Sequence, residues 1–131
     1  MKRIWITVLA LLFLLTGCGG DSASSTGENS YQQITQETAK QMMDEQDVII
    51  LDVREQDEYD SGHIVDAALL PVGTIDAETA AAVIPEKDSI VLVYCRSGNR
   101  SKTASAALVA LGYTQIYEFG GINDWPYDIE K

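Results

Sequence analysis

Apolar and polar residues alternate in blocks along residues 31–131, and two of the apolar blocks are rich in β-branched residues. The segments VIILDV (48–53) and SIVLVYC (89–95) are nearly continuous apolar runs, which are typical of strands buried on both faces of a sheet. AALLPV (67–72) predicts a brief strand stopped by Pro71. QIYEF (115–119) predicts the last strand of the chain.

Segments with helical spacing of apolar residues lie between these strands. Thr35 predicts the N-cap of a first helix, and a second helix is expected to begin near Asp76. Residues 101–113 predict a third helix closed by Gly112, whereas the polar segment before Gly62 predicts only a short helical turn. GGINDW, after the last strand, is expected to turn into a short helix. Strands alternating with helices indicate a single α/β domain with a mainly parallel central sheet flanked by helices on both faces.

The first residues have the pattern of an export signal. Lys2 and Arg3 precede an apolar run from Ile4 to Leu15, which is shorter than the ~20 residues that span a bilayer. LTGC, ending at Cys18, resembles the bacterial lipobox, in which cleavage before the cysteine leaves a lipidated N-terminus. We therefore predict a lipoprotein signal peptide at 1–17 and a lipid on Cys18. An ordinary signal peptide cut at small residues, with Cys18 a plain thiol, is the alternative.

The segment GGDSASSTGENS (19–30) contains Gly, Ser, Thr and acidic residues and predicts, together with Cys18, a flexible tether over 18–30. Residues 31–131 then form the folded domain. Its place is expected to be the extracytoplasmic face of a bacterial cell membrane, or an outer membrane if the organism has one, with the lipid on Cys18 as anchor.

Charge narrows the range of partners. The chain has a net charge of −11, and removal of Lys2 and Arg3 leaves seven basic against twenty acidic residues, a net charge of −13. A domain this acidic is not expected to bind nucleic acid through its phosphates. Anionic lipid head groups would also repel it, so it is expected to stand off the membrane to which it is tethered.

Cys95 is the candidate reactive residue. If Cys18 carries lipid, Cys95 is a lone thiol in an exported protein, and it stands at the carboxyl end of a predicted parallel strand, where such sheets bind ligands. The following helix start and the nearby Arg96 and Arg100 favour a thiolate, whose pKa at such sites falls to ~3.5–7.5 from ~8.5. Gly98 allows a tight turn that points successive amides at one anion.

Three separated motifs resemble the rhodanese family of sulfurtransferases. CRSGNRS (95–101) resembles the family's active-site loop, VIILDVREQDEYDSGHI (48–64) its strand-and-turn signature, and FGGINDW (119–125) its terminal Gly-Gly-x-x-x-Trp. The resemblance covers essentially residues 32–131. One departure is that Val65-Asp66-Ala67 stands where the family often has Pro-Gly-Ala.

The resemblance implies a membrane-tethered sulfurtransferase in which Cys95 is the catalytic nucleophile and accepts a sulfane sulfur as a persulfide. The donor is expected to be an anion such as thiosulfate and the acceptor cyanide or a thiol. No metal or organic cofactor is implied, and a monomer is expected. The implied substrate-binding residues are those of the loop: Arg96, Ser97, Gly98, Asn99, Arg100 and Ser101.

Two other functions stay open on the sequence. A small Cys-dependent phosphatase also uses a thiolate in a ring of amides, but its loop has five residues between Cys and Arg, against four between Cys95 and Arg100. A persulfide- or redox-sensing or binding module would use the same loop, react once and not turn over.

Other polar and aromatic residues in these motifs are expected to be mainly structural. Asp52 and Arg54 are expected to form ion pairs or turn hydrogen bonds, His63 to make a structural hydrogen bond and Trp125 to pack in the core. Tyr94, together with Ser101, is expected to line the pocket beside Cys95.

Overall fold

The structure, a computed structural model, describes residues 30–131. The predicted signal peptide, Cys18 and all but the last residue of the predicted tether lie outside these residues, so their limits stay predictions. Within residues 30–131, no helix combines the length and the apolar character needed to cross a membrane.

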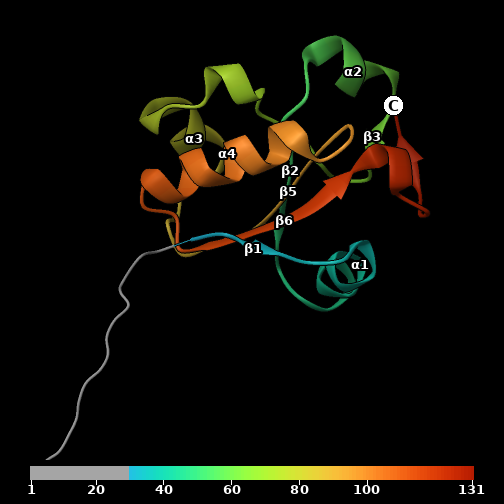
Figure 1. The fold of residues 1–131 in the computed structure, drawn as a ribbon, viewed down its shortest axis with the longest axis horizontal. Helices are drawn as coiled ribbons and strands as arrows, with labels where there is room; N and C mark the ends of the chain where they lie inside the picture. Colours follow the sequence, from blue (N-terminus) through green and yellow to red (C-terminus); the bar gives the residue numbers. More distant parts are fainter. Residues whose placement is uncertain (1–29) are drawn as a thin grey trace, which may run out of the picture.

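A five-stranded sheet in the order β1-β6-β5-β2-β4 forms the centre of the domain, and every neighbouring pair in it is parallel (Figure 1). The interior strands are β2 (Ile49–Asp52), β5 (Ile90–Cys95) and β6 (Gln115–Gly121). The edge strands β1 (Gln32–Gln33) and β4 (Ala68–Leu69) are only two residues long. The sequence prediction of a mainly parallel α/β fold is confirmed.

Helices cover both faces of this sheet (Figure 1). The helix α1 (Gln36–Glu45) lies on one face, whereas α3 (Ala77–Val83) and α4 (Asn99–Ala110) lie on the other. Because strand side chains alternate between faces, Val91, Val93 and Cys95 of β5 pack on the α3 and α4 side, and Leu92 and Tyr94 pack on the α1 side. The strand β5 is therefore buried on both faces, as its apolar run predicts.

Helix ends follow the capping residues of the sequence. The Thr35 hydroxyl accepts the Thr38 amide at 3.0 Å at the start of α1, and Asp76 forms a capping box at the start of α3. The short helix α2 (Gln56–Ser61) ends at Gly62, as predicted. The helix α4 was expected from residue 101, but it begins at Asn99, because Gly98 takes a left-handed conformation directly before it.

The prediction that QIYEF forms the last strand is wrong. A strand β7 (Ile129–Glu130) follows and pairs antiparallel with β3 (His63–Ile64) in a separate two-stranded sheet. Neither segment lies in an apolar run like the one that predicted the equally short β4, so only the tertiary pairing of β3 with β7 defines these strands. Within residues 30–131, the 3-10 helices η2 (Val72–Thr74) and η3 (Ile122–Asp124) complete the fold, and η3 confirms the predicted short helix after Gly120-Gly121.

Asp52 and Arg54 form a buried ion pair, as expected. The Arg54 guanidinium donates to the Asp52 carboxylate at 2.7 Å and to the Gly62 carbonyl at 2.7 Å, and so joins the end of β2 to the end of α2. The Tyr94 hydroxyl also donates to Asp52, at 2.7 Å, and accepts the Ile64 amide at 3.0 Å. The pKa of Tyr94 is raised by burial and by its hydrogen bond to Asp52, so its hydroxyl keeps its proton.

His63 and Trp125 have the structural roles expected of them. The His63 ring stacks on Tyr59 with 3.7 Å between centroids, and its Nδ1 lies 2.9 Å from the Tyr59 carbonyl oxygen. Trp125 is half-buried and packs against Phe119, with ring centroids 5.5 Å apart. Both residues therefore have structural roles: Trp125 and Tyr59 pack against the core on the α1 side of the sheet, and His63 stacks on Tyr59.

Candidate active site

Cys95 is the last residue of β5 and lies at the carboxyl end of the central strands, directly before the N-terminus of α4 (Figure 1). The residue is 1% exposed. The Gly98 amide donates to its Sγ at 3.0 Å. The first amides of a helix have no partner within the helix and carry a partial positive charge. The fold therefore places a thiol where an anion is stabilised.

The loop from Cys95 to Gly98 is tightly packed against β6. A Cβ atom at Gly121 would overlap the Arg96 carbonyl group, and a Cβ at Gly98 would contact the backbone of Gly120. Gly98 also has a φ of 108°, which disfavours any other residue. The Asn123 amide donates to the Arg96 carbonyl at 3.1 Å. The backbone of Gly120 and Gly121 therefore packs directly against the loop, and the Asn123 amide of η3 holds the loop in place through its hydrogen bond.

The pKa of the Cys95 thiol is lowered from its ordinary value. Burial by itself raises this pKa, but the hydrogen bond with the Ser101 hydroxyl and those from the amides of Ser101, Gly98 and Ser97 outweigh it. Hydrogen bonding thus stabilises the negative charge on sulfur. This agrees with the sequence expectation that the loop favours a thiolate.

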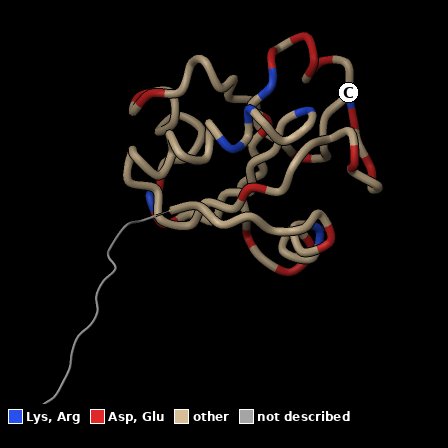
Figure 2. The backbone as a smooth tube through the Cα atoms, in the orientation of Figure 1, with Lys and Arg blue, Asp and Glu red and all other residues tan. Residues whose placement is uncertain are grey.

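The two arginines of the loop differ in their surroundings. Arg100, half-buried in the first turn of α4, donates from Nη1 and Nη2 to the two carboxylate oxygens of Glu58, at 2.8 and 3.0 Å. The pKa of Arg100 is raised first by these hydrogen bonds and also by the charges of Glu58 and Cys95. Arg96 is exposed and has no ion-pair partner in residues 30–131. Figure 2 shows basic segments around the end of β5, while acidic segments are spread over the outer helices and the C-terminal segment.

The other predicted loop residues have different positions. The Ser101 Oγ lies 3.4 Å from the Cys95 Sγ, as expected for a residue lining the site. Ser97 and Asn99 are exposed at the mouth of the loop. Tyr94 does not line it: its side chain turns to the α1 face of the sheet, because consecutive residues of a strand point to opposite faces.

The geometry of this loop agrees with the comparison to known families. The sequence model of the family described as "Rhodanese-like domain" matches residues 35–127. The chain belongs to the rhodanese-like domain family. Its sequence is 33% identical over 96 residues to "Thiosulfate sulfurtransferase GlpE" of Coxiella burnetii, covering 72% of this chain and 87% of that protein.

Two further relatives of this rhodanese-like domain are informative. "Putative sulfur carrier protein YrkF" of Bacillus subtilis is 33% identical over 108 residues, covering 81% of this chain and 57% of that protein. The solved structure titled "rhodanese with anions from E. coli" superposes with a TM-score of 0.60 and 30% sequence identity, covering 65% of this chain and 99% of that chain. Sulfur transfer and sulfur carriage are thus both named among relatives of similar sequence.

Two acidic residues at the rhodanese-like site escaped the sequence analysis. Glu58, in α2, is paired with Arg100, and Glu118, in β6, is buried beside Ser101. Strand alternation gave a signal for Glu118, because it stands two positions after Ile116 and therefore shares the same face of the strand. Ile116 packs on the α4 side of the sheet, so Glu118 enters the same layer. No comparable signal exists for Glu58, because its partner is 42 residues away in the chain.

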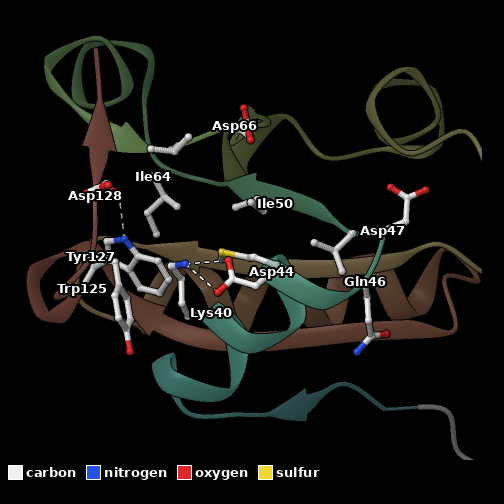
Figure 3. A pocket seen from close by; sticks show the side chains of 13 residues that line it. Lys40, Asp44, Gln46, Asp47, Ile50, Ile64, Asp66, Trp125, Tyr127 and Asp128 are labelled. Carbon is white, nitrogen blue, oxygen red and sulfur yellow. Dashed lines mark hydrogen bonds and ion pairs between the residues drawn. The ribbon is translucent and has the colours of Figure 1, made fainter.

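A pocket of about 390 Å³ lies away from Cys95 and contains none of the loop residues in its lining (Figure 3). It lies between α1 and the C-terminal segment, where Trp125 and Tyr127 face Lys40.

Among residues 30–131, no three His, Cys, Asp or Glu side chains are grouped so that they could hold a metal ion.

Proposed function

We propose that this protein is a sulfurtransferase that carries a sulfane sulfur from a donor such as thiosulfate to a thiophilic acceptor as a persulfide on Cys95. The observation that carries this proposal is the position of the Cys95 Sγ, 3.0 Å from the Gly98 amide at the start of α4. The lowered pKa of Cys95 supplies the thiolate that the reaction needs. The sulfurtransferase name of the Coxiella burnetii relative supports the same assignment.

Two displacement steps describe the reaction. The Cys95 thiolate attacks the outer sulfur of thiosulfate, a new S–S bond forms, the S–S bond of thiosulfate breaks, and sulfite leaves with that electron pair. An acceptor thiolate or cyanide then attacks the outer sulfur of the persulfide, and Cys95 leaves again as a thiolate. No net oxidation or reduction accompanies the cycle, and each leaving group departs as an anion. The amides of Ser97, Gly98 and Ser101 are the donors available to stabilise the charged sulfur.

Anionic donors are attracted by the arginines of the loop. Arg96 is exposed, so its charge acts at long range and steers an anion toward the loop. Arg100 is held by Glu58, which leaves its guanidinium close enough to Cys95 for the two charges to stabilise each other. Arg100 therefore supports the thiolate and the anion that reacts with it.

The attachment to a membrane belongs to the same proposal. The LTGC segment ending at Cys18 and the tether over residues 18–30 support a lipid-anchored protein on the extracytoplasmic face of a bacterial membrane. After removal of Lys2 and Arg3, seven basic residues remain against twenty acidic ones, and this net charge of −13 argues for a domain that stands off anionic lipid rather than lying on it. Its substrates in that place are small sulfur anions and thiols.

Sulfur carriage without turnover is the alternative with most support, since a relative from Bacillus subtilis is named a putative sulfur carrier protein. The same Cys95 persulfide would serve that role. A phosphatase is disfavoured, because only four residues separate Cys95 from Arg100 and the resulting ring of amides is smaller than a phosphate group needs.

The test is mass spectrometry of the purified domain after thiosulfate treatment, followed by assay of sulfite release with cyanide or a thiol as acceptor. A sulfurtransferase gains one sulfur on Cys95, loses it to the acceptor and releases sulfite repeatedly. A carrier or sensor gains the sulfur but releases sulfite only once per molecule. Cys95→Ser should gain no sulfur, because a serine hydroxyl without an adjacent base has almost no anionic fraction near neutral pH. Sulfur uptake by the Cys95→Ser variant would overturn the proposal.

A further inference from the structure

The two faces of the sheet are covered unequally, and the pocket beside α1 lies on the less covered face. Within residues 30–131, α1 lies on this face, whereas α3 and α4 lie on the other (Figure 1). The pocket has a volume of about 390 Å³ (Figure 3). Two residues of its lining, Ile50 of β2 and Ile64 of β3, are 7% and 2% exposed and give it an apolar floor. Small-molecule sites in proteins have similar volumes, roughly 300–1,000 Å³.

The C-terminal segment gives this pocket an aromatic wall. Trp125 and Tyr127 meet edge to face with 4.8 Å between ring centroids, and Tyr127 is 37% exposed. The Lys40 Nζ lies 5.6 Å from the centroid of the Tyr127 ring, while both carboxylate oxygens of Asp44 hold it at 2.8 and 2.9 Å. The face of an aromatic ring attracts cations up to about 6 Å away. The wall therefore already has one cation beside it, and that cation belongs to α1.

The charges around the pocket are mostly negative. One lysine and four aspartates line it, a net charge of −3 (one base less four acids). Asp44 is paired with Lys40, whereas Asp47, Asp66 and Asp128 form no ion pair within residues 30–131. A cleft lined by charges of one sign concentrates ions of the opposite sign. An anion is repelled here, whereas a cation with an apolar body matches the carboxylates, the rings and the floor.

Asp66 is where this chain departs from its family. Val65-Asp66-Ala67 stands where the family often has Pro-Gly-Ala, and both Val65 and Asp66 line the pocket. Asp66 has a φ of 71°, a left-handed conformation that glycine adopts freely. Aspartate tolerates this conformation better than most residues. The departure therefore adds a carboxylate to the pocket at a position where the backbone would accept glycine.

We propose that this pocket binds a small organic cation, an amine carried on an apolar or aromatic body. The body packs on Ile50 and Ile64, and the ammonium group is stabilised by the ring of Tyr127 and by the carboxylates of Asp66 and Asp128. No covalent bond forms or breaks in this binding. The site goes beyond sulfur transfer and does not rest on it, because none of the loop residues 95–101 lines the pocket.

The test is a titration followed by the fluorescence of Trp125. Residues 30–131 contain every strand and both apolar cores of the described fold, and Trp125 is the only tryptophan in this segment. The probes are 2-phenylethylammonium, the neutral 2-phenylethanol and the anionic phenylacetate, which share one aromatic body. We expect a saturable change with the ammonium probe, bound about fivefold or more tighter than the alcohol, with phenylacetate the weakest. The preference for the cation should shrink in high salt.

Asp66→Gly separates the contribution of the carboxylate from effects on folding, because glycine suits the φ of this position. We expect the Kd of the ammonium probe to rise about threefold or more, while the Kd of 2-phenylethanol stays unchanged. Asp128→Asn should act in the same direction. Glu86→Gln is the matched control, since it removes one exposed negative charge away from the pocket and should leave both values unchanged.

Three results would overturn the proposal. These are no saturation with the ammonium probe, equal affinities for the three probes, and equal effects of Asp66→Gly and Glu86→Gln. Amide NMR spectra locate the probe: shifts are expected at residues 43–48, 64–66 and 125–128, and shifts confined to residues 95–101 would also contradict the site. These measurements use no sulfur donor, so a failure of sulfur uptake on Cys95 leaves the cation site in place.

Discussion

Arg100 and Glu58 form a two-pronged ion pair that joins the first turn of α4 to α2, with N···O distances of 2.8 and 3.0 Å. Arg100 belongs to the loop over residues 95–101, and the two bonds hold its guanidinium in one orientation near Cys95. Planar pairing of this kind fixes geometry as well as charge. The pair therefore fixes Arg100, the cation expected to face the substrate, to α2, the polar helix that follows β2.

Arg100→Ala should impair sulfur uptake more than Arg96→Ala. Loss of Arg100 removes a cation next to Cys95 and leaves Glu58 unpaired, so we expect about a tenfold or larger fall in the second-order rate with thiosulfate at any salt concentration. Arg96→Ala should act on the apparent affinity for thiosulfate, and its effect should fade in high salt because Arg96 is exposed. Equal, salt-independent losses at both positions would contradict this division.

The Glu58–Arg100 pair should make stability depend on pH in the acid range. The pKa of Glu58 is lowered to about 2, first by its hydrogen bond to Arg100, so the folded state binds a proton less readily than the unfolded state. The stabilisation is therefore present above the unfolded pKa of about 4.5 and is lost as pH falls toward 2. Because both side chains are partly exposed, its size is about 1 kcal/mol.

Urea unfolding between pH 6 and pH 2 measures this contribution in the wild-type domain and in Arg100→Met. In the variant, the pKa of Glu58, followed by NMR through its carboxyl resonance, should move toward the ordinary range of a glutamate. The loss of unfolding free energy in acid should then be smaller than in the wild-type domain. A Glu58 titration that is unaffected by the substitution would contradict the assignment.

Gly121→Ala should disrupt the loop that follows Cys95, because the added Cβ overlaps the Arg96 carbonyl group. Overpacking of this kind costs about 1–3 kcal/mol and would displace the loop amides. The unfolding midpoint in urea and the rate of persulfide formation should both fall. Gly73→Ala is the matched control, since nothing lies within 4 Å of a Cβ at that position. Similar behaviour of the two variants would show that the loop does not depend on this contact.

Arg54→Met should destabilise the domain by about 3–5 kcal/mol, because it leaves the Asp52 carboxylate, which is 0% exposed, without its cation. Tyr94→Phe should cost less, about 1–2 kcal/mol, because Asp52 loses the Tyr94 hydroxyl but keeps Arg54, and the Ile64 amide loses its acceptor. The exposed pair of Lys40 and Asp44 offers a control: Lys40→Met should change the free energy of unfolding by less than about 0.5 kcal/mol.

Cys18→Ser should abolish lipidation and leave the protein either unprocessed or free of the membrane. The reason is the Leu15-Thr16-Gly17-Cys18 segment after a short apolar run. Partition into detergent, measured after expression in a bacterial host, reports the lipid anchor. A processed Ser variant that still partitions like the parent would show that the anchor is elsewhere.

The sequence by itself determined the layered α/β fold and the place of Cys95 at the end of a buried strand. The β-branched runs at 48–53 and 89–95 can be satisfied only in the interior of a parallel sheet, and the capping residues Thr35 and Gly62 mark helix ends through local hydrogen bonds and backbone freedom. Cys95, at the junction of such a strand with a helix, follows from the same local pattern. The helix caps depend on residues close together in the chain, and the burial of the two strands is encoded in their own apolar composition, although their pairing joins distant segments.

The tertiary structure alone decided which distant groups meet at Cys95. Glu58 reaches Arg100 because the fold brings α2 near the start of α4, and Glu118 reaches Ser101 because β6 packs against α4, over separations of 42 and 17 residues. Tyr94, next to Cys95 in the chain, is turned to the other face of the sheet by strand alternation and bonds to Asp52 instead. The pairing of β3 with β7 likewise joins segments too short to have a pattern of their own. Hydrogen bonds and ion pairs between remote residues depend on the relative positions of whole elements, and local residue patterns do not encode those positions.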